Sequence, residues 1–216
     1  MTVMESTSKP VIIIGVNGNC LDIAEAIEAS ANMHVMGFLD DDPSLGAHSL
    51  IGGHPFLGPL SNANKFPTAH FVCGIGSSRS YLQKPSIIER IDVTPDRWAT
   101  VVHPTAVVSR YAILNPGCVL LAHVSVGARA RVGSHCTFLQ QTIVSHDAIV
   151  GAFSILASGV CISGGVTIGD NTYLGSRVAV RDGLKIGTRS LLGIGSVVVK
   201  DVAADTIAYG NPARPK

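Results

Sequence analysis

The residues best suited to proton-transfer chemistry in this sequence are a histidine and the aspartate that follows it, His146 and Asp147. A neutral imidazole accepts a proton at neutral pH, and an adjacent carboxylate can fix its tautomer and raise its basicity. The pair therefore predicts a general base. The alternative is a solvent-exposed histidine on a turn, with no chemical role.

A second candidate site is the segment Gly15–Cys20, between the apolar run Val11–Ile14 and a stretch with helical spacing. Free amide groups at a helix N-terminus favour a phosphate group. A full dinucleotide fingerprint would need glycine where Asn17 and Cys20 stand. The segment therefore predicts a site for a single nucleotide or nucleotide-sugar rather than NAD. A tight turn without a ligand stays open as the alternative.

The element that must position His146 is a repeat. Every sixth residue from Val102 to Val198 is large and apolar, the next is often glycine, and the fifth of each six is nearly always small or valine. A period of six is typical of a parallel β-helix built from hexapeptides, and chance periodicity in a β-sandwich is the weaker alternative. We expect the apolar and fifth residues to point inward, and the glycine to relax the backbone where the chain bends. His146 and Asp147, third and fourth in their hexapeptide, should face outward near an edge.

The residues before the repeat predict a small open parallel α/β unit. The expected strands are 11–14, 34–39 and 70–75, the expected helices are 21–31 and 80–91, and residues 44–67 are expected to form a loop. The domains expected are a loose tail at 1–10, the α/β unit at 11–93, the repeat at 94–199, and a tail at 200–216 that leaves the repeat register.

The charge and the cysteines limit the partners and the compartment. There are 16 lysines and arginines against 15 aspartates and glutamates, so nothing steers the chain toward nucleic acid or an anionic membrane. No apolar run is long enough to span a membrane, and Met1–Pro10 does not read as a signal peptide. Five cysteines without a CxxC pattern suit a reducing compartment. We therefore expect a cytoplasmic protein.

The runs that begin at Val126, Val150 and Ile168 resemble those of the hexapeptide-repeat acyltransferases. The order of the α/β unit, Phe38–Pro43, His103–Ala106 and the repeat is similar to one subgroup, the sialic-acid O-acetyltransferase and UDP-4-amino-sugar N-acetyltransferase family. The resemblance covers nearly the whole chain from Val11. It implies a left-handed parallel β-helix, a Rossmann-like unit that holds the nucleotide of a nucleotide-sugar, and a homotrimer.

The same resemblance implies roles for individual residues. The run from His146 to Gly151 matches the family's catalytic motif, with His146 as the base and Asp147 beside it. The nucleotide-sugar positions are matched by Asn17, Gly18, Asn19, Asp40, Asp41 and Gly74, the last with Arg79 five residues on. The positions near acetyl-CoA are matched by Ile155, Gly164, Ser176 and Ile194.

The sequence departs from the family at three places. Asn19 and Cys20 replace the histidine and last glycine of the first loop, Ile155 stands where the N-acetyltransferases have a second histidine, and Leu139 stands where they often have asparagine. The expected function is transfer of an acetyl group from acetyl-CoA to the amino group of a nucleotide-linked amino sugar, without a metal. Three alternatives remain: sugar O-acetylation, a non-catalytic nucleotide-sugar-binding scaffold, and a metal site that uses His123, His135 and His146.

Overall fold

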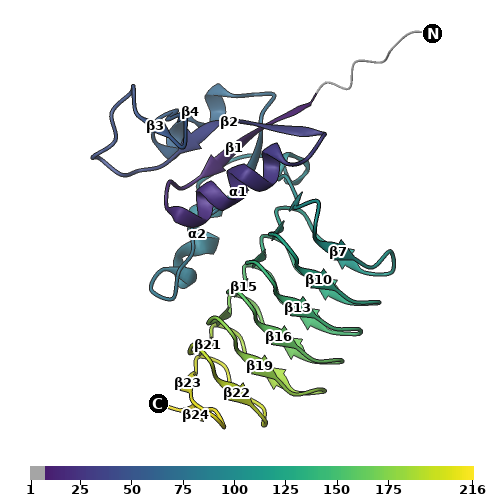
Figure 1. Ribbon diagram of the computed structural model, residues 1–216. Coiled ribbons are helices and arrows are strands. Elements are labelled where there is room, and N and C mark those ends of the chain that lie inside the picture. Colours follow the sequence, from purple (N-terminus) through teal and green to yellow (C-terminus); the bar gives the residue numbers. More distant parts are fainter. Residues whose placement is uncertain (1–7) are drawn as a thin grey trace, which may run out of the picture.

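The structure is a computed structural model that describes residues 8–216. A small α/β unit lies along one side of a long stack of coils, and the chain ends at the far end of that stack (Figure 1). Most of the predicted N-terminal tail, residues 1–7, lies outside the described residues. The first strand, β1 (Lys9–Ile14), begins two residues earlier than predicted.

The N-terminal unit is built on three parallel strands in the order β2-β1-β5, where β2 is Met33–Leu39 and β5 is His70–Cys73. The apolar run in β1 is fully buried because both faces of the sheet are covered. Val11 and Ile13 pack in a cluster with residues of helix α1 (Gly18–Glu28), whereas Ile12 and Ile14 pack on the other face.

The helices and loops of this unit differ from the prediction in their bounds. Helix α1 begins three residues earlier than predicted, because the side chain of Asn17 accepts a hydrogen bond from the backbone N–H of Asn19 and caps the first turn. The second predicted helix is a 3₁₀ turn, η2 (Tyr81–Gln83), followed by the short helix α2 (Lys84–Glu89). The predicted loop and the linker hold further elements: β3 (Leu50–Ile51), β4 (His54–Pro55), and the 3₁₀ helices η1 (Leu60–Lys65) and η3 (Pro95–Arg97).

The repeat forms the predicted parallel β-helix, in which each hexapeptide supplies one two-residue strand. The strands are β6 (Val101–Val102), β7 (Val107–Val108), β8 (Ile113–Leu114), β9 (Val119–Leu120), β10 (Ser125–Val126), β11 (Arg131–Val132), β12 (Thr137–Phe138), β13 (Ile143–Val144), β14 (Ile149–Val150), β15 (Ile155–Leu156), β16 (Cys161–Ile162), β17 (Thr167–Ile168), β18 (Tyr173–Leu174), β19 (Ala179–Val180), β20 (Lys185–Ile186), β21 (Leu191–Leu192) and β22 (Val197–Val198).

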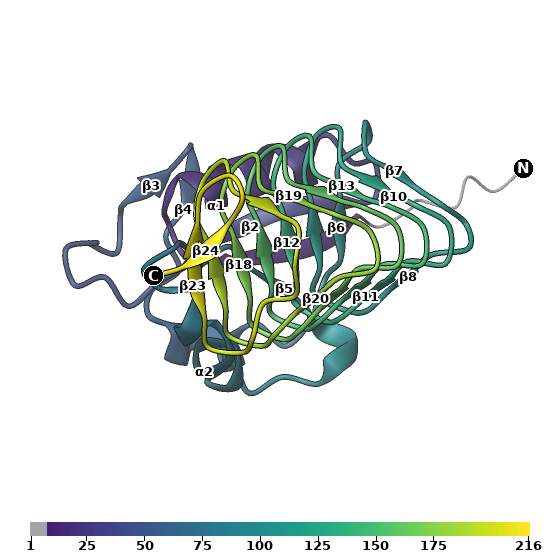
Figure 2. The same cartoon turned by 90° about the horizontal axis from the view of Figure 1, so that it is seen from below.

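Each coil adds one strand to each of three parallel sheets, which Figure 2 shows as the sides of the stack. Sheet 1 contains β6, β9, β12, β15, β18 and β21; sheet 2 contains β7, β10, β13, β16, β19 and β22; sheet 3 contains β8, β11, β14, β17 and β20. Ser125 pairs with Ile143 and Val126 with Val144, so residues 18 apart lie directly above one another. This stacking gives three edges, which we name by the sheets they join: the 1–2, 2–3 and 3–1 edges.

The inside of the stack is filled as predicted. The apolar column is almost completely buried from Leu120 to Val198, and the small residues of the fifth column, such as Ala130 and Cys136, are inaccessible to solvent. The first positions of the column, Val102 and Val108, are only partly buried. Coils that cannot bury an apolar face alone therefore share one continuous core.

The predicted reason for the glycine column was wrong. Gly127 and Gly133 do not take a positive φ; the left-handed residues are those in the fourth column, such as Arg129 and Asp147. A Cβ at Gly127 would lie 2.7 Å from the backbone nitrogen of His146, and a Cβ at Gly133 would lie 2.5 Å from that of Ala152. These glycines allow successive coils to stack closely.

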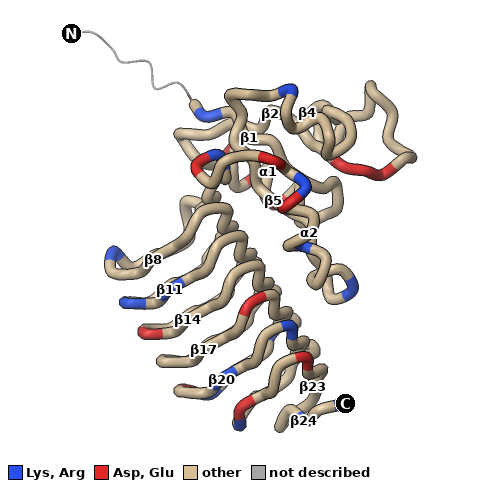
Figure 3. Tube along the Cα trace, turned by 180° about the vertical axis from the view of Figure 1, so that it is seen from behind, with Lys and Arg blue, Asp and Glu red and all other residues tan. Residues whose placement is uncertain are grey.

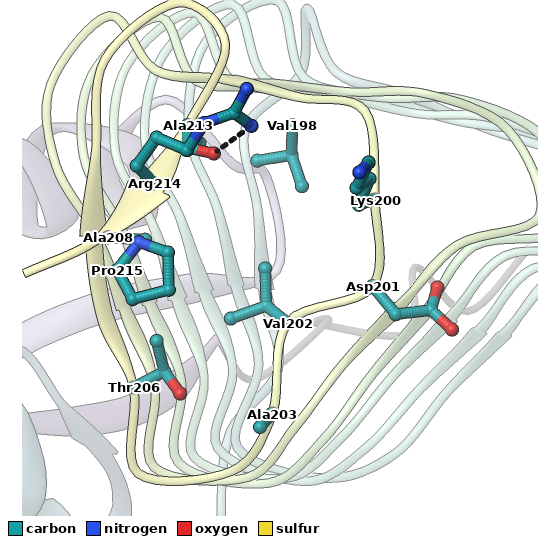
Figure 4. Close-up of a pocket in the computed structure, with 10 residues that line it drawn as sticks. All are labelled: Val198, Lys200, Asp201, Val202, Ala203, Thr206, Ala208, Ala213, Arg214 and Pro215. Carbon is teal, nitrogen blue, oxygen red and sulfur yellow. Dashed lines mark hydrogen bonds between the residues drawn. The ribbon is translucent and has the colours of Figure 1, made fainter.

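Residues 200–216 leave the repeat register as predicted, because Leu191 pairs with Ile207, 16 rather than 18 residues on, but they are not a separate tail and extend sheet 1. Strand β23 (Ile207–Tyr209) pairs parallel with β21, and β24 (Arg214–Pro215) pairs antiparallel with β23. A cavity of about 440 Å³ lies at this end. Figure 4 shows Val198 and Val202 pointing into it, with Lys200 and Arg214 among the residues around it. The segment closes the last coil.

The N-terminal unit covers sheet 1 and leaves the other two sheets open. The outward residues Val119 and Ile155 of sheet 1 are buried, whereas Ile143 of sheet 2 and Ile149 of sheet 3 are each 44% exposed. Lys84 of α2 is 1% exposed and donates a hydrogen bond of 2.8 Å to the hydroxyl of Thr137. Figure 3 shows charges of both signs spread along the turns of the stack, in keeping with the small net charge.

Candidate active site

His146 and Asp147 lie on the 2–3 edge, in the turn between β13 and β14. The imidazole Nδ1 is 2.8 Å from Oδ2 of Asp147, and the two side chains are 67% and 40% exposed. The prediction that both face outward is confirmed. The turn holds this geometry because Asp147 has a φ of 60° and its N–H donates to the carbonyl of Ala128 on the coil before. Aspartate tolerates the left-handed region better than most residues.

Gly164 lies directly beneath the imidazole. A Cβ at this position would be 2.6 Å from Cε1 and 2.8 Å from Nε2 of His146. The N–H of Gly165 donates to the carbonyl of His146, which ties the two coils together at this point. The resemblance implied that Gly164 contacts acetyl-CoA. In the structure, the atoms nearest to a Cβ at Gly164 belong to His146, the predicted base.

The sequence analysis missed a third residue of this cluster, Arg129. Its Nε is 2.6 Å from Oδ1 of Asp147, and its second guanidinium nitrogen is 2.8 Å from Oδ2. Arg129 and then His146 hydrogen-bond this carboxylate and lower the pKa of Asp147 to about 2. A coil length of 18 residues is a signal for this contact, because it places residue 129 directly above residue 147.

The residues predicted to hold the nucleotide meet at one edge of the N-terminal sheet. Asn17 caps α1, whose first residues are Gly18 and Asn19, while Asp40 follows β2 and Gly74 follows β5. Because these three parallel strands are neighbours, their carboxyl ends lie together, where ligands bind in open α/β sheets. The structure therefore brings these residues together.

Asp41 differs from Asp40 in its contacts. Burial opposes ionisation of Asp41, but the hydrogen bond from the Leu60 N–H and the ion pair with Arg90 outweigh that cost and lower its pKa. The carboxylate of Asp41 thus ties its loop to η1 and α2. Asp40 accepts a hydrogen bond from the N–H of Asp42, two residues on.

Gly74 and Cys20 lie in close contact, and this contact accounts for both residue types. A Cβ at Gly74 would lie 2.5 Å from the Sγ of Cys20, so only glycine lets α1 approach β5 this closely. Cys20 is fully buried, and burial raises the pKa of its thiol above the ordinary range. The cysteine that departs from the family's loop is a packed core residue.

The remaining residues predicted to lie near acetyl-CoA are not close to His146 within one chain. Ser176 and Ile194 lie on the 1–2 edge, where they line a cavity of about 430 Å³ with Tyr173, Tyr209 and Ser78 of the N-terminal unit. Ile155 of sheet 1 is 2% exposed and packs in one cluster with Tyr173 of the same sheet and Tyr81 of η2. The candidate acyl-donor residues are therefore divided between two edges of the stack.

Residues 8–216 give no support to a metal site or a membrane span. Within this range no group of three or more histidine, cysteine, aspartate or glutamate side chains is placed to hold a metal ion. His123, His135 and His146 lie on three different edges. Nor does this part of the chain contain a helix long and apolar enough to cross a membrane.

The parallel β-helix places this chain in the class of hexapeptide-repeat proteins. The outward His146–Asp147 pair gives it a candidate general base on a coil edge. No protein-family model matches the chain. A curated relative is UDP-N-acetylbacillosamine N-acetyltransferase of Bacillus subtilis (strain 168), which is 28% identical over 119 residues. That match spans about half of each protein, 53% of this chain and 52% of the relative.

Several solved structures match almost the whole chain, and two of them serve as examples. One is a histidine-to-alanine variant of GDP-perosamine N-acetyltransferase from Caulobacter crescentus in complex with CoA and GDP-perosamine, with 27% identity, a TM-score of 0.84 and 96% of each chain covered. The other is the acetyltransferase domain of PglB from Neisseria gonorrhoeae FA1090 in complex with acetyl coenzyme A, with 25% identity, a TM-score of 0.87, and 97% of this chain and 100% of the other covered. The predicted resemblance to hexapeptide-repeat acyltransferases of the UDP-4-amino-sugar N-acetyltransferase family is confirmed.

Proposed function

We propose that this protein transfers the acetyl group of acetyl-CoA to the amino group of a nucleotide-linked amino sugar, with His146 as the general base. The observation that carries the proposal is the outward His146–Asp147 pair with its 2.8 Å contact. The two relatives in complex with CoA, GDP-perosamine or acetyl coenzyme A support the choice of substrates.

The protonation of the pair follows from its contacts. Asp147, with a pKa of about 2, is ionised at neutral pH and can only accept a hydrogen bond. The imidazole Nδ1 therefore carries the hydrogen, and the lone pair of Nε2 is left for the substrate. In the proposed step the sugar amine attacks the thioester carbonyl while Nε2 takes its proton. The carbon–sulfur bond then breaks, and the proton passes to the departing sulfur of CoA.

The nucleotide is proposed to bind at the carboxyl ends of β1, β2 and β5. This N-terminal unit is Rossmann-like in our proposal, with Asn17, Gly18 and Asn19 at the N-terminus of α1 facing the phosphates. Asp40 and Gly74 would lie beside the nucleoside. Asp41 is already paired with Arg90, so it would shape the loop rather than bind the ligand.

The divided acyl-donor residues favour a homotrimer of left-handed β-helices. His146 and Gly164 would supply one wall of the site, and Ser176, Ile194 and the N-terminal unit of a neighbouring subunit would supply the other. The half-exposed Ile143 and Ile149 would be covered by such a contact. We propose that residues 11–93 hold the nucleotide-sugar, that residues 94–199 bind acetyl-CoA, and that the enzyme works in the cytoplasm.

A thiol-release assay with acetyl-CoA and a panel of UDP-, GDP- and dTDP-linked amino sugars tests the function. We expect CoA release that depends on one of these sugars, with the acetyl group found on nitrogen by mass spectrometry. An acetyl group on a hydroxyl oxygen would favour the O-acetyltransferase alternative. Tight binding of a nucleotide-sugar without CoA release from any acceptor would favour the non-catalytic scaffold and contradict the proposal.

A further inference from the structure

The contact between Arg129 and Asp147 forms a chain of three side chains that ends at the imidazole. We propose that Arg129 is a positioning residue for the general base, because it fixes the Asp147 carboxylate that orients His146. This inference rests on the proposed function. It gives a role to Arg129, which lies outside the motif formed by His146 and the acidic residue that follows it.

The geometry of the contact restricts the carboxylate. One guanidinium group meets both oxygens of Asp147, at 2.6 and 2.8 Å, and Oδ2 also meets Nδ1 of His146 at 2.8 Å. Two parallel hydrogen bonds from a planar fork define the plane of a carboxylate, which a single bond to histidine does not. Asp147 is 40% exposed, so without Arg129 water would compete for its oxygens.

The backbone places the two side chains in register. Arg129 and Asp147 occupy the same position in consecutive coils, and each has a φ of 60°. The N–H of Asp147 donates to the carbonyl of Ala128, the neighbour of Arg129, at 2.9 Å. Equal backbone conformation one coil apart sends both side chains in the same direction, so the pair forms without distortion of either turn.

The charge of Arg129 also acts on the imidazole. On its own turn His146 meets the negative Asp147, and the turn above supplies Arg129. Arg131 lines the same groove as Asp147, and the turn below, residues 163–166, carries no charged side chain. Removal of Arg129 leaves the charge of Asp147 less compensated, which favours the imidazolium form. The acid limb of the pH–rate profile should then move to higher pH.

The chain contains a matched control for this pair. Arg189 meets Asp205 in the same two-bond arrangement, at 2.6 Å for both contacts, with side chains 54% and 57% exposed. That pair lies on the 3–1 edge, away from His146. If such pairs only hold coils together, then loss of either arginine should have the same effect.

The experiment compares wild type with Arg129→Met, Arg129→Lys and Arg189→Met. For Arg129→Met we expect kcat to fall roughly tenfold, less than the 10²–10⁴ expected for loss of a base, with little change in KM. Its acid limb should shift to higher pH. Arg129→Lys should restore the position of the acid limb but not kcat, because it keeps the charge and loses the fork. Arg189→Met should keep the wild-type kcat and profile.

An NMR titration of the His146 ring on the same proteins needs no substrate and keeps this inference separate from the proposed function. We expect the imidazole of Arg129→Met to hold its proton to higher pH than that of wild type or Arg189→Met. An unchanged His146 titration in Arg129→Met overturns the inference, as does a kcat equal to that of Arg189→Met. An inactive wild type with the expected NMR shift would contradict the proposed function alone.

Discussion

His146 is held by contacts on both sides of its ring. Asp147 meets Nδ1, and Gly164 of the next coil leaves room for Cε1 and Nε2. Because Nδ1 contacts Asp147, our proposal assigns proton transfer to Nε2, and the space for Nε2 depends on a glycine that has no side chain. The imidazole is thus in contact with one residue beside it and one beneath it.

Gly164→Ala tests the contact beneath the ring. The new Cβ would lie 2.6 Å from Cε1, so the imidazole must turn away. We expect kcat to fall by about 10²-fold, the loss typical of a misplacement of about 1 Å. Gly46→Ala is the control, because its Cβ would meet its nearest neighbour only at 4.0 Å. Kinetics measured over a range of acetyl-CoA concentrations decide the matter: a raised KM for acetyl-CoA with normal kcat would show that Gly164 serves the donor instead.

At the scale of elements, the six-residue period was sufficient to predict the strands and the direction of their side chains. Val144 and Ala148 point inward and His146 and Asp147 point outward because a strand alternates its faces and the turns are fixed by the stack. The sequence could not show why Gly127 is glycine, because the limiting contact is with His146, 19 positions away and in another coil. The Arg129–Asp147 pair differs: a coil of about 18 residues places the two residues one above the other, but it does not show that two exposed side chains meet.

The N-terminal unit was harder to predict in detail. Short 3₁₀ elements such as η1 and η2 have no strong periodicity, and their ends depend on contacts with distant residues such as the bond from Leu60 to Asp41. The three parallel strands were easier to predict than the start of α1, because their apolar runs are local signals, whereas the Asn17 cap that begins the helix at Gly18 was not predicted. Local signals were readable, and contacts between elements were not.

Lys84 joins α2 to sheet 1 at an electrostatic cost. Burial lowers the pKa of its amine below the ordinary 10.5, and its hydrogen-bond partner is the neutral hydroxyl of Thr137. At a pH between the lowered pKa of Lys84 in the folded protein and its ordinary pKa of 10.5, the amine is protonated in the unfolded chain but neutral in the folded chain. The free energy of unfolding therefore falls as the pH falls from 10.5.

Lys84→Met should remove this cost while it keeps most of the side-chain volume. We expect the melting temperature at neutral pH to rise by about 3 °C. We also expect the melting temperature of the variant to increase less between roughly pH 7 and 10 than that of wild type. Lys65→Met, at an exposed position, is the control and should change neither. Thermal unfolding followed across this pH range provides the test. A variant less stable than the control would mean that the bond to Thr137 outweighs the burial of the amine.

At the scale of the whole molecule, the candidate site is divided. His146 and Gly164 lie on the 2–3 edge, whereas Ser176 and Ile194 lie on the 1–2 edge. A single chain cannot bring the two edges together, because the stacked coils form a rigid prism with its own core. If both edges serve one site, as we propose, that site requires a neighbouring subunit.

Co-expression of two inactive variants tests this division. His146→Ala removes the base, and Ser176→Trp fills the cavity on the other edge. Mixed trimers would contain sites that combine His146 of one subunit with Ser176 of another, so we expect about a quarter of wild-type activity from random assembly. Each variant expressed alone should be inactive, and light scattering should show a trimer in all samples. An inactive mixture of well-assembled trimers would place the whole site within one chain.

The central claim is that His146 accepts the proton in acetyl transfer, and His146→Ala tests it most directly. At saturating acetyl-CoA, kcat should fall by about 10²–10⁴-fold, the contribution typical of a positioned general base. The side chain is 67% exposed, so the melting temperature and the trimer should match those of wild type. A variant that keeps more than about a tenth of the wild-type kcat would contradict the account. So would loss of activity together with loss of the fold, because His146 would then be a structural residue.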